Sequence, residues 1–269
     1  MAVWGPDAPP REALPYDIAP SRALRWYDVV VLPLGALAVT FLAGGAALLA
    51  DRYIFRTGFD IWGTWVPDFE AAWFIYTIEI ALYAGFILTG VALLALRGHR
   101  LAGIYFPRIR PGSVLAACGM GIVLAFAFAW ALSLLPDDTQ QQLMERNELL
   151  MPSSAGEAIL LAIVGVLLAP IAEELYFRGV LLRLLSARLS FAVSAGVTAL
   201  LFSLIHGHLF ISPGLGGWTL TVMLFAIGFV LAGFARVTGS LRAPAIMHGA
   251  YNAVLLGPSV LLAFMDLPI

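Results

Sequence analysis

The sequence predicts an all-α, polytopic integral membrane protein, a bundle of about seven transmembrane helices with eight as the alternative. Of its 269 residues, 61% are hydrophobic and only 12% are charged, whereas soluble domains carry about 25% charged residues. The mean hydropathy is +0.92, and the apolar residues gather in long stretches. A soluble core of this size could not cover so much apolar surface, so we expect lipid to be the solvent.

Seven stretches reach, or nearly reach, the roughly 20 apolar residues that a helix needs to cross the hydrocarbon core of a bilayer. In chain order they cover residues 29–50, 71–96, 113–135, 158 into the region of Glu173, 191–211, 217–235 and 243–265. Residues 138–150, between the third and fourth stretches, are polar and are expected to form a short helix on the outer surface.

The chain is expected to divide into three regions. Residues 1–28 contain several prolines, which block a long helix, and they are too polar for a signal peptide. We interpret them as a cytoplasmic N-terminal arm. Residues 29–150 supply the first transmembrane helices and loops, and residues 151–269 supply a C-terminal core that holds the polar residues discussed below.

The distribution of arginine predicts the orientation. All fifteen basic residues are arginine, and crowded loops alternate with sparse ones. The loop after the second stretch holds four arginines and no acidic residue: Arg97, Arg100, Arg108 and Arg110. Because basic residues are retained on the cytoplasmic side, the pattern places the N-terminus in the cytoplasm and, for seven spans, the C-terminus outside.

Composition also argues against several functional classes. A net charge of −2 gives no indication of a nucleic-acid partner. Cys118 is the sole cysteine, so neither an internal disulfide nor a thiolate metal site is expected. The absence of internal repeats argues against transporters that are built from inverted repeats.

Charged groups at membrane depth are the strongest functional signal, because each costs at least about 2.5 kcal/mol to insert. The C-terminal half concentrates them. They are Glu173, Glu174 and Arg178 in APIAEELYFRGVLLRLL, His206 and His208 in LLFSLIHGHLF, and His248 with Asn252 in APAIMHGAYNAV. A fourth-residue spacing places Glu174 with Arg178, and His248 with Asn252, on shared helix faces. We expect Glu174 and Arg178 to pair, because pairing lowers the cost of burying both charges.

The depths of these residues also agree. The fourth and fifth stretches are expected to form a hairpin that turns near residues 189–190. Glu173 and His206 lie at similar separations from that turn, so their side chains should sit at the same level. Phe202 and His206 repeat the fourth-residue spacing, so three helices each present one polar stripe.

These residue types allow two kinds of hydrolytic chemistry. A carboxylate beside an imidazole can take a proton from water, while a second histidine and an asparagine amide can stabilise an oxyanion. Alternatively, Glu173, His206 and His248 are a possible zinc ligand set with an open position for water. The sequence leaves both open, so zinc is an optional cofactor here. Simpler structural roles are expected for Glu79, which shares a helix face with Tyr76 and Tyr83, and for His208.

The three segments resemble the CAAX protease and bacteriocin-processing family of intramembrane proteases, also called the abortive-infection family. The family pattern EExxxR corresponds to Glu173, Glu174 and Arg178. The pattern FxxxH corresponds to Phe202 and His206, and the pattern HxxxN to His248 and Asn252. All three occur in the family's order, and the resemblance covers about residues 155–260.

This resemblance implies a helical membrane core whose site opens to the cytoplasmic side. It implies that Glu173 and His206 activate water, that His248 and Asn252 form the oxyanion site, and that Glu174 and Arg178 support Glu173, with direct participation of Glu174 in catalysis as an alternative. A metal-free, glutamate-dependent mechanism is favoured over a zinc-dependent one. The small size and the use of arginine alone suggest a bacterial member in the inner membrane, acting on a peptide or membrane-protein substrate in contact with membrane lipid.

Two other functions use the same residues. A non-catalytic immunity protein, or a binder of peptide or lipid, would hold its ligand in the polar pocket by hydrogen bonds. A proton-coupled transporter would use Glu79 and Glu173, although the lack of repeats argues against it.

Overall fold

The computed structural model describes residues 24–56, 58, 60, 62–69, 71–147 and 151–265. Within these residues, seven helices are long and apolar enough to cross a membrane. They are α1 (Asp28–Ala50, continued by a π-helix over Asp51–Phe55), α2 (Ala72–Leu96), α4 (Pro111–Ser133), a composite helix over Ala155–Ser186, α9 (Phe191–Ile205, with α10 at His208–Ile211), α11 (Leu215–Thr238) and α12 (Arg242–Phe264). The predicted all-helical membrane fold is confirmed.

Shorter helices lie between the spans. Helix α3 (Leu101–Tyr105) follows α2, and α5 (Asp137–Asn147) follows α4. Helix α5 corresponds to the predicted short polar helix, of which residues 148–150 lie outside the described residues. Residues 1–23 of the predicted N-terminal arm also lie outside them.

Local sequence signals explain where several helices begin. Ser154 precedes the composite helix, and its side chain accepts a hydrogen bond from the Glu157 backbone N–H. Ser190 caps α9 in the same way through the Val193 N–H. Helix α4 begins at Pro111, whose fixed φ suits the first helical position and whose missing N–H is not needed there.

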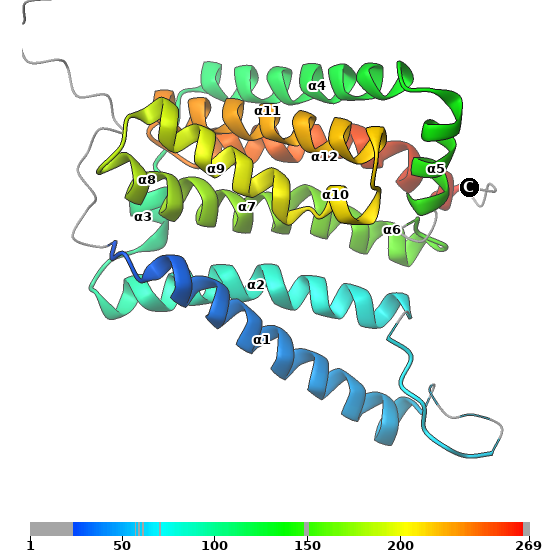
Figure 1. Cartoon of the computed structure of the whole chain (residues 1–269). Helices are drawn as coiled ribbons and strands as arrows, with labels where there is room; N and C mark the ends of the chain where they lie inside the picture. The colour runs from blue at the N-terminus through cyan, green and yellow to red at the C-terminus, as the bar shows by residue number, and fades with distance from the viewer. Residues whose placement is uncertain are drawn as a thin grey trace, which may run out of the picture.

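The helices are arranged from α4 at one edge of the bundle to α1 at the other (Figure 1). Helix α4 packs on α12, α9 packs on α11, and the composite helix contacts both α12 and α2. Small residues permit the closest approaches, as is typical of membrane helices. Gly85 of α2 lies against the backbone of Ala36 in α1, and Gly121 of α4 lies against the Met247 carbonyl of α12.

The composite helix is interrupted twice by π-helical turns. It consists of α6 (Ala155–Ala162), a π-helix (Ile163–Leu168), α7 (Ala169–Glu174), a second π-helix (Leu175–Leu181) and α8 (Leu182–Ser186). Pro170 explains the first interruption, because it has no N–H to donate to the carbonyl four residues earlier and its ring clashes with that carbonyl. Such π-helical turns occur frequently at functional sites, and here they flank the two glutamates.

An ion pair fastens the helix pair α1–α2 at one end. The two terminal nitrogens of Arg97, just past α2, lie 2.7 Å from the two carboxylate oxygens of Asp28 at the start of α1. Hydrogen bonding to Asp28 raises the pKa of the Arg97 guanidinium above its already high ordinary value, so this cation keeps its charge at every working pH. The hydroxyl of Tyr176 also donates to the Val29 carbonyl at 3.2 Å, which joins α1 to the composite helix.

Candidate active site

Glu174 and Arg178 form a completely buried ion pair. Arg178 Nη1 lies 2.8 Å from Glu174 Oε1, and neither side chain is exposed. The pairing predicted from their spacing is therefore confirmed. In a low-dielectric interior each charge alone would be very costly, so each group compensates the charge of the other.

Arg178 is fixed by two further neighbours. Its Nη2 donates to the Gly228 carbonyl of α11 at 2.9 Å, and its guanidinium carbon lies 4.7 Å from the ring centroid of the buried Phe202. A Cβ at position 228 would come within 3.3 Å of Arg178 Nη2. The glycine therefore gives the guanidinium room to reach the α11 backbone.

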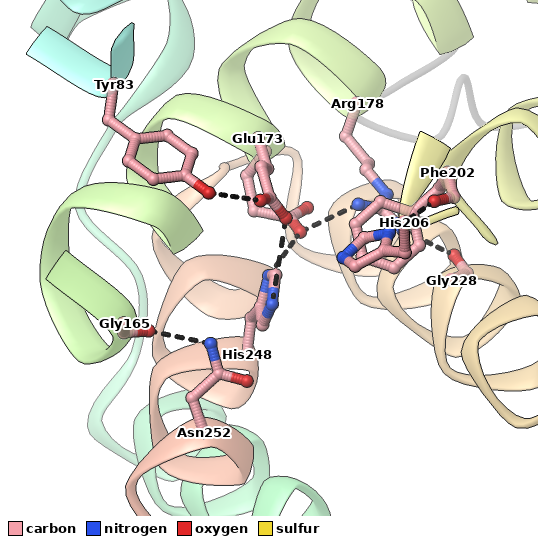
Figure 2. A network of polar contacts seen from close by, with 10 residues as sticks. Tyr83, Gly165, Glu173, Arg178, Phe202, His206, Gly228, His248 and Asn252 are labelled. Carbon is pink, nitrogen blue, oxygen red and sulfur yellow. Dashed lines mark hydrogen bonds and ion pairs between the residues drawn. The ribbon is translucent and has the colours of Figure 1, made fainter. Parts of the chain in front are cut away.

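His248 of α12 lies between the two glutamates. Its Nδ1 is 3.3 Å from Glu174 Oε1, and its Nε2 is 3.9 Å from Glu173 Oε2. Figure 2 shows the imidazole facing the carboxylate of Glu173. If both glutamates are ionised, Arg178 balances one charge and a protonated His248 balances the second, so the cluster can be neutral without any further ion.

Glu173 also faces α2. The hydroxyl of Tyr83 points at Glu173 Oε1 across 3.5 Å (Figure 2). The Glu173 side chain is 14% exposed, so it is the more accessible of the two glutamates. Sequence reasoning missed Tyr83 as a site residue. The available signal was its position on the same face of α2 as Glu79, which was interpreted as structural.

His206 ends α9 and satisfies a backbone group of that helix. Its Nδ1 lies 2.7 Å from the Phe202 carbonyl oxygen, one of the carbonyls that have no partner in the last turn of a helix. Gly207 follows with φ +71°, a conformation that suits glycine and ends the helix. When Nδ1 carries the proton for this bond, Nε2 is left as the acceptor, which suits a general base.

Phe202 links the two imidazoles. Its ring contacts His206 at a centroid distance of 4.8 Å and His248 at 5.8 Å, both edge-on. The His206 ring in turn stacks with His208 at 6.2 Å. The FxxxH spacing therefore has a physical role, because one residue supplies both the carbonyl that sets the tautomer of His206 and the ring between the histidines.

Asn252 lies one turn beyond His248 on α12 and contacts the composite helix. Its Nδ2 donates to the Gly165 carbonyl at 2.7 Å. Pro170, five residues after Gly165, cannot donate to that carbonyl in a π-helical pattern, so the asparagine supplies a donor in the opened turn. An amide nitrogen carries two hydrogens, and the second remains for another acceptor.

Two carboxylate oxygens are buried without a hydrogen bond from any described residue, namely Glu173 Oε2 and Glu174 Oε2. Buried polar atoms are normally satisfied, so exceptions indicate a place where a donor such as water or substrate is accepted. Glu173 Oε2 faces His248 Nε2 across 3.9 Å. The oxygen that could accept a further donor therefore lies among the predicted site residues.

The alternative zinc set does not fit the geometry. Among the described residues, no group of three or more histidine, cysteine, aspartate and glutamate side chains is arranged to hold a metal ion. The predicted zinc set therefore does not form a single coordination sphere, although Glu173, His206 and His248 belong to one cluster. His206 Nδ1 is directed at the Phe202 carbonyl of its own helix.

Residues 155–254 match the family model described as type II CAAX prenyl endopeptidase Rce1-like, so this part of the chain is a domain of that family. The match contains all three predicted motifs, from Glu173 to Asn252. No curated protein and no solved structure gives a significant match to the chain.

Proposed function

We propose that this membrane protein with an Rce1-like domain is an intramembrane endopeptidase, with Glu173, Glu174, His206, His248 and Asn252 as its catalytic residues. The observation that carries the proposal is the convergence of Glu173 and Glu174 on His248, with His206 joined to the same cluster through Phe202. Ionisable groups at this depth are costly and are typically functional. The family of residues 155–254 agrees with peptide-bond hydrolysis.

Water activation is assigned to Glu173 and His206. Glu173 is the partly accessible carboxylate, and His206 keeps Nε2 as an acceptor because Nδ1 faces the Phe202 carbonyl. A water between these groups would lose its proton as its oxygen attacks the peptide carbonyl carbon. The proton would then pass to the leaving nitrogen as the carbon–nitrogen bond breaks.

The tetrahedral oxyanion is assigned to His248 and Asn252. A protonated His248 supplies positive charge beside the attacked carbonyl, and the second amide hydrogen of Asn252 supplies a neutral donor. Glu174 holds His248 from its other side at 3.3 Å, and Arg178 neutralises Glu174. Fixed donors of this kind are effective because they need not reorganise during the reaction.

The proposed substrate is a peptide or membrane protein that reaches the site from the cytoplasmic side. The arginine-rich segments between α2 and α4 and over residues 183–188 carry the charges that the positive-inside rule assigns to the cytoplasmic side. The proposed location is a bacterial inner membrane with the N-terminus in the cytoplasm.

Turnover of a peptide library in detergent tests the proposal. Glu173→Gln and His206→Ala each remove one proton acceptor, and each should lower turnover on the order of 10²–10⁴-fold. Glu157→Gln and His99→Ala are matched controls, because they change the same residue types outside the cluster. Wild-type turnover in both site variants would reject the assignment. Peptide binding without any cleavage by the unaltered protein would favour the non-catalytic binder.

A chelator experiment tests the mechanism separately. The proposed residues need no metal, so activity should survive dialysis against a chelator. Activity that disappears and returns only with Zn²⁺ would reject the glutamate-dependent mechanism while keeping the proteolytic function.

A further inference from the structure

We propose that α2 completes the active site, with Tyr83 as a positioning residue that orients the carboxylate of Glu173. This inference rests on the proposed function and extends the site beyond residues 155–254 to a helix that the family match does not include. Its starting observation is the 3.5 Å contact between the Tyr83 hydroxyl and Glu173 Oε1.

The contact belongs to an extended helix interface. Tyr83, Phe86 and Gly90 lie three, then four, residues apart, so they share one face of α2. Phe86 packs on Tyr176 with ring centroids 5.6 Å apart, and a Cβ at position 90 would lie 3.0 Å from a methyl group of Leu175. All three therefore meet residues 173–176, and the close approach at Gly90 brings α2 near enough for the tyrosine to reach the glutamate.

The same interface is held at its end. The Asp28–Arg97 ion pair fastens α1 to the end of α2, and the bond from Tyr176 to the Val29 carbonyl fastens α1 to the composite helix. Through α1, these two attachments prevent α2 from shifting along its axis relative to the composite helix. Tyr83 is thereby kept at the level of Glu173.

The chemistry gives the hydroxyl a defined role. A tyrosine hydroxyl can donate to a carboxylate, and with Oε1 directed at Tyr83 the other oxygen, Oε2, faces His248 at 3.9 Å. Without that donor the carboxylate could rotate and present either oxygen. The 3.5 Å from the Tyr83 hydroxyl to Glu173 Oε1 is long for a hydrogen bond. Such long contacts are common between catalytic groups before substrate binds.

Tyr83→Phe removes only the hydroxyl and is the direct test. We expect kcat for the peptide substrate to fall on the order of tenfold to a hundredfold, as for loss of a hydrogen bond to a charged group. KM and the unfolding temperature should stay near their wild-type values. Tyr76→Phe is the matched control, because Tyr76 lies on the same face of α2, two turns earlier, and should leave kcat unchanged.

The outcomes separate the two proposals. An inactive wild-type protein would refute the proposed function itself. An active wild-type protein with unchanged kcat in Tyr83→Phe would refute only the role of Tyr83. A loss that appears equally in Tyr76→Phe, or that accompanies a lowered unfolding temperature, would also refute it, because a general packing defect would then explain the effect.

Discussion

Replacing Arg178 with methionine should destabilise the protein more than any surface change. The substitution keeps a flexible apolar side chain of similar length but removes the cation that pairs with Glu174 at 2.8 Å, both groups being fully buried. It also removes the donor to Gly228 O and the cation over Phe202. Removing one partner of a buried ion pair costs about 3–5 kcal/mol, because the other charge is left uncompensated.

The paired substitution sharpens this prediction. Glu174→Gln removes the charge that Arg178 balances, so a Glu174→Gln/Arg178→Met double variant no longer buries an unpaired ion. It should lose clearly less stability than the sum of the two single variants, since contacting residues couple by about 0.5–3 kcal/mol. At about 2–4 °C per kcal/mol for a chain of roughly this size, the Arg178→Met variant should unfold roughly 6–20 °C below the wild type.

Thermal unfolding followed by tryptophan fluorescence in detergent measures all four proteins of this cycle. Arg188→Met is the control, because Arg188 is exposed in the turn before α9 and should change the unfolding temperature little. Additive losses in the double variant would contradict the reasoning, because they would mean that Glu174 and Arg178 do not stabilise one another.

Three other predictions concern the surroundings of the site. Pro170→Ala restores an N–H that can bond to the preceding turn, so the first π-helix should close and move Glu173; turnover should fall on the order of 10²-fold, with helix content by circular dichroism retained. Asn252→Leu leaves the Gly165 carbonyl without its 2.7 Å donor, which should cost about 1–3 kcal/mol in thermal unfolding and lower kcat by roughly 10²–10³-fold. Asp28→Asn weakens the attachment of α1 to Arg97 by about 1.5–3 kcal/mol, visible as earlier proteolysis near residues 97–110, the segment that begins at Arg97. Unchanged turnover in Pro170→Ala would contradict the first prediction, and an unchanged unfolding temperature in Asn252→Leu would contradict the second. Unchanged cleavage in Asp28→Asn would contradict the third.

The spans and the buried pair could be predicted because their causes are local. Seven apolar stretches of sufficient length leave few alternatives to a helical membrane bundle, and the residues that the structure describes form seven helices long and apolar enough to span. The pairing of Glu174 with Arg178 follows from their spacing and from the cost of leaving either charge alone. Both inferences need no knowledge of how distant segments meet.

Contacts between segments far apart in the chain could not be predicted from the sequence. Tyr83 and Glu173 are separated by 90 positions, and nothing in either helix alone indicates that the two faces meet. The bond from Asn252 to Gly165 was also not foreseen, because it depends on a carbonyl released by the opened turn before Pro170. Similarly, α9 ends at Ile205, since the imidazole of His206 and the left-handed Gly207 stop a helix that its apolar residues alone would continue.

The two π-helical turns set the direction in which the side chains of the composite helix point. Each π-type turn closes its hydrogen bond one residue later than an α-turn, so it contains one residue more than an α-turn would. One extra residue rotates the side chains that follow by about 100° around the helix axis. Deleting a single position from the stretch 163–168 would therefore rotate the adjacent glutamates together with the guanidinium below them, although not one of those residues had been altered. In this part of the chain, the number of residues is as much a determinant of chemistry as their identity.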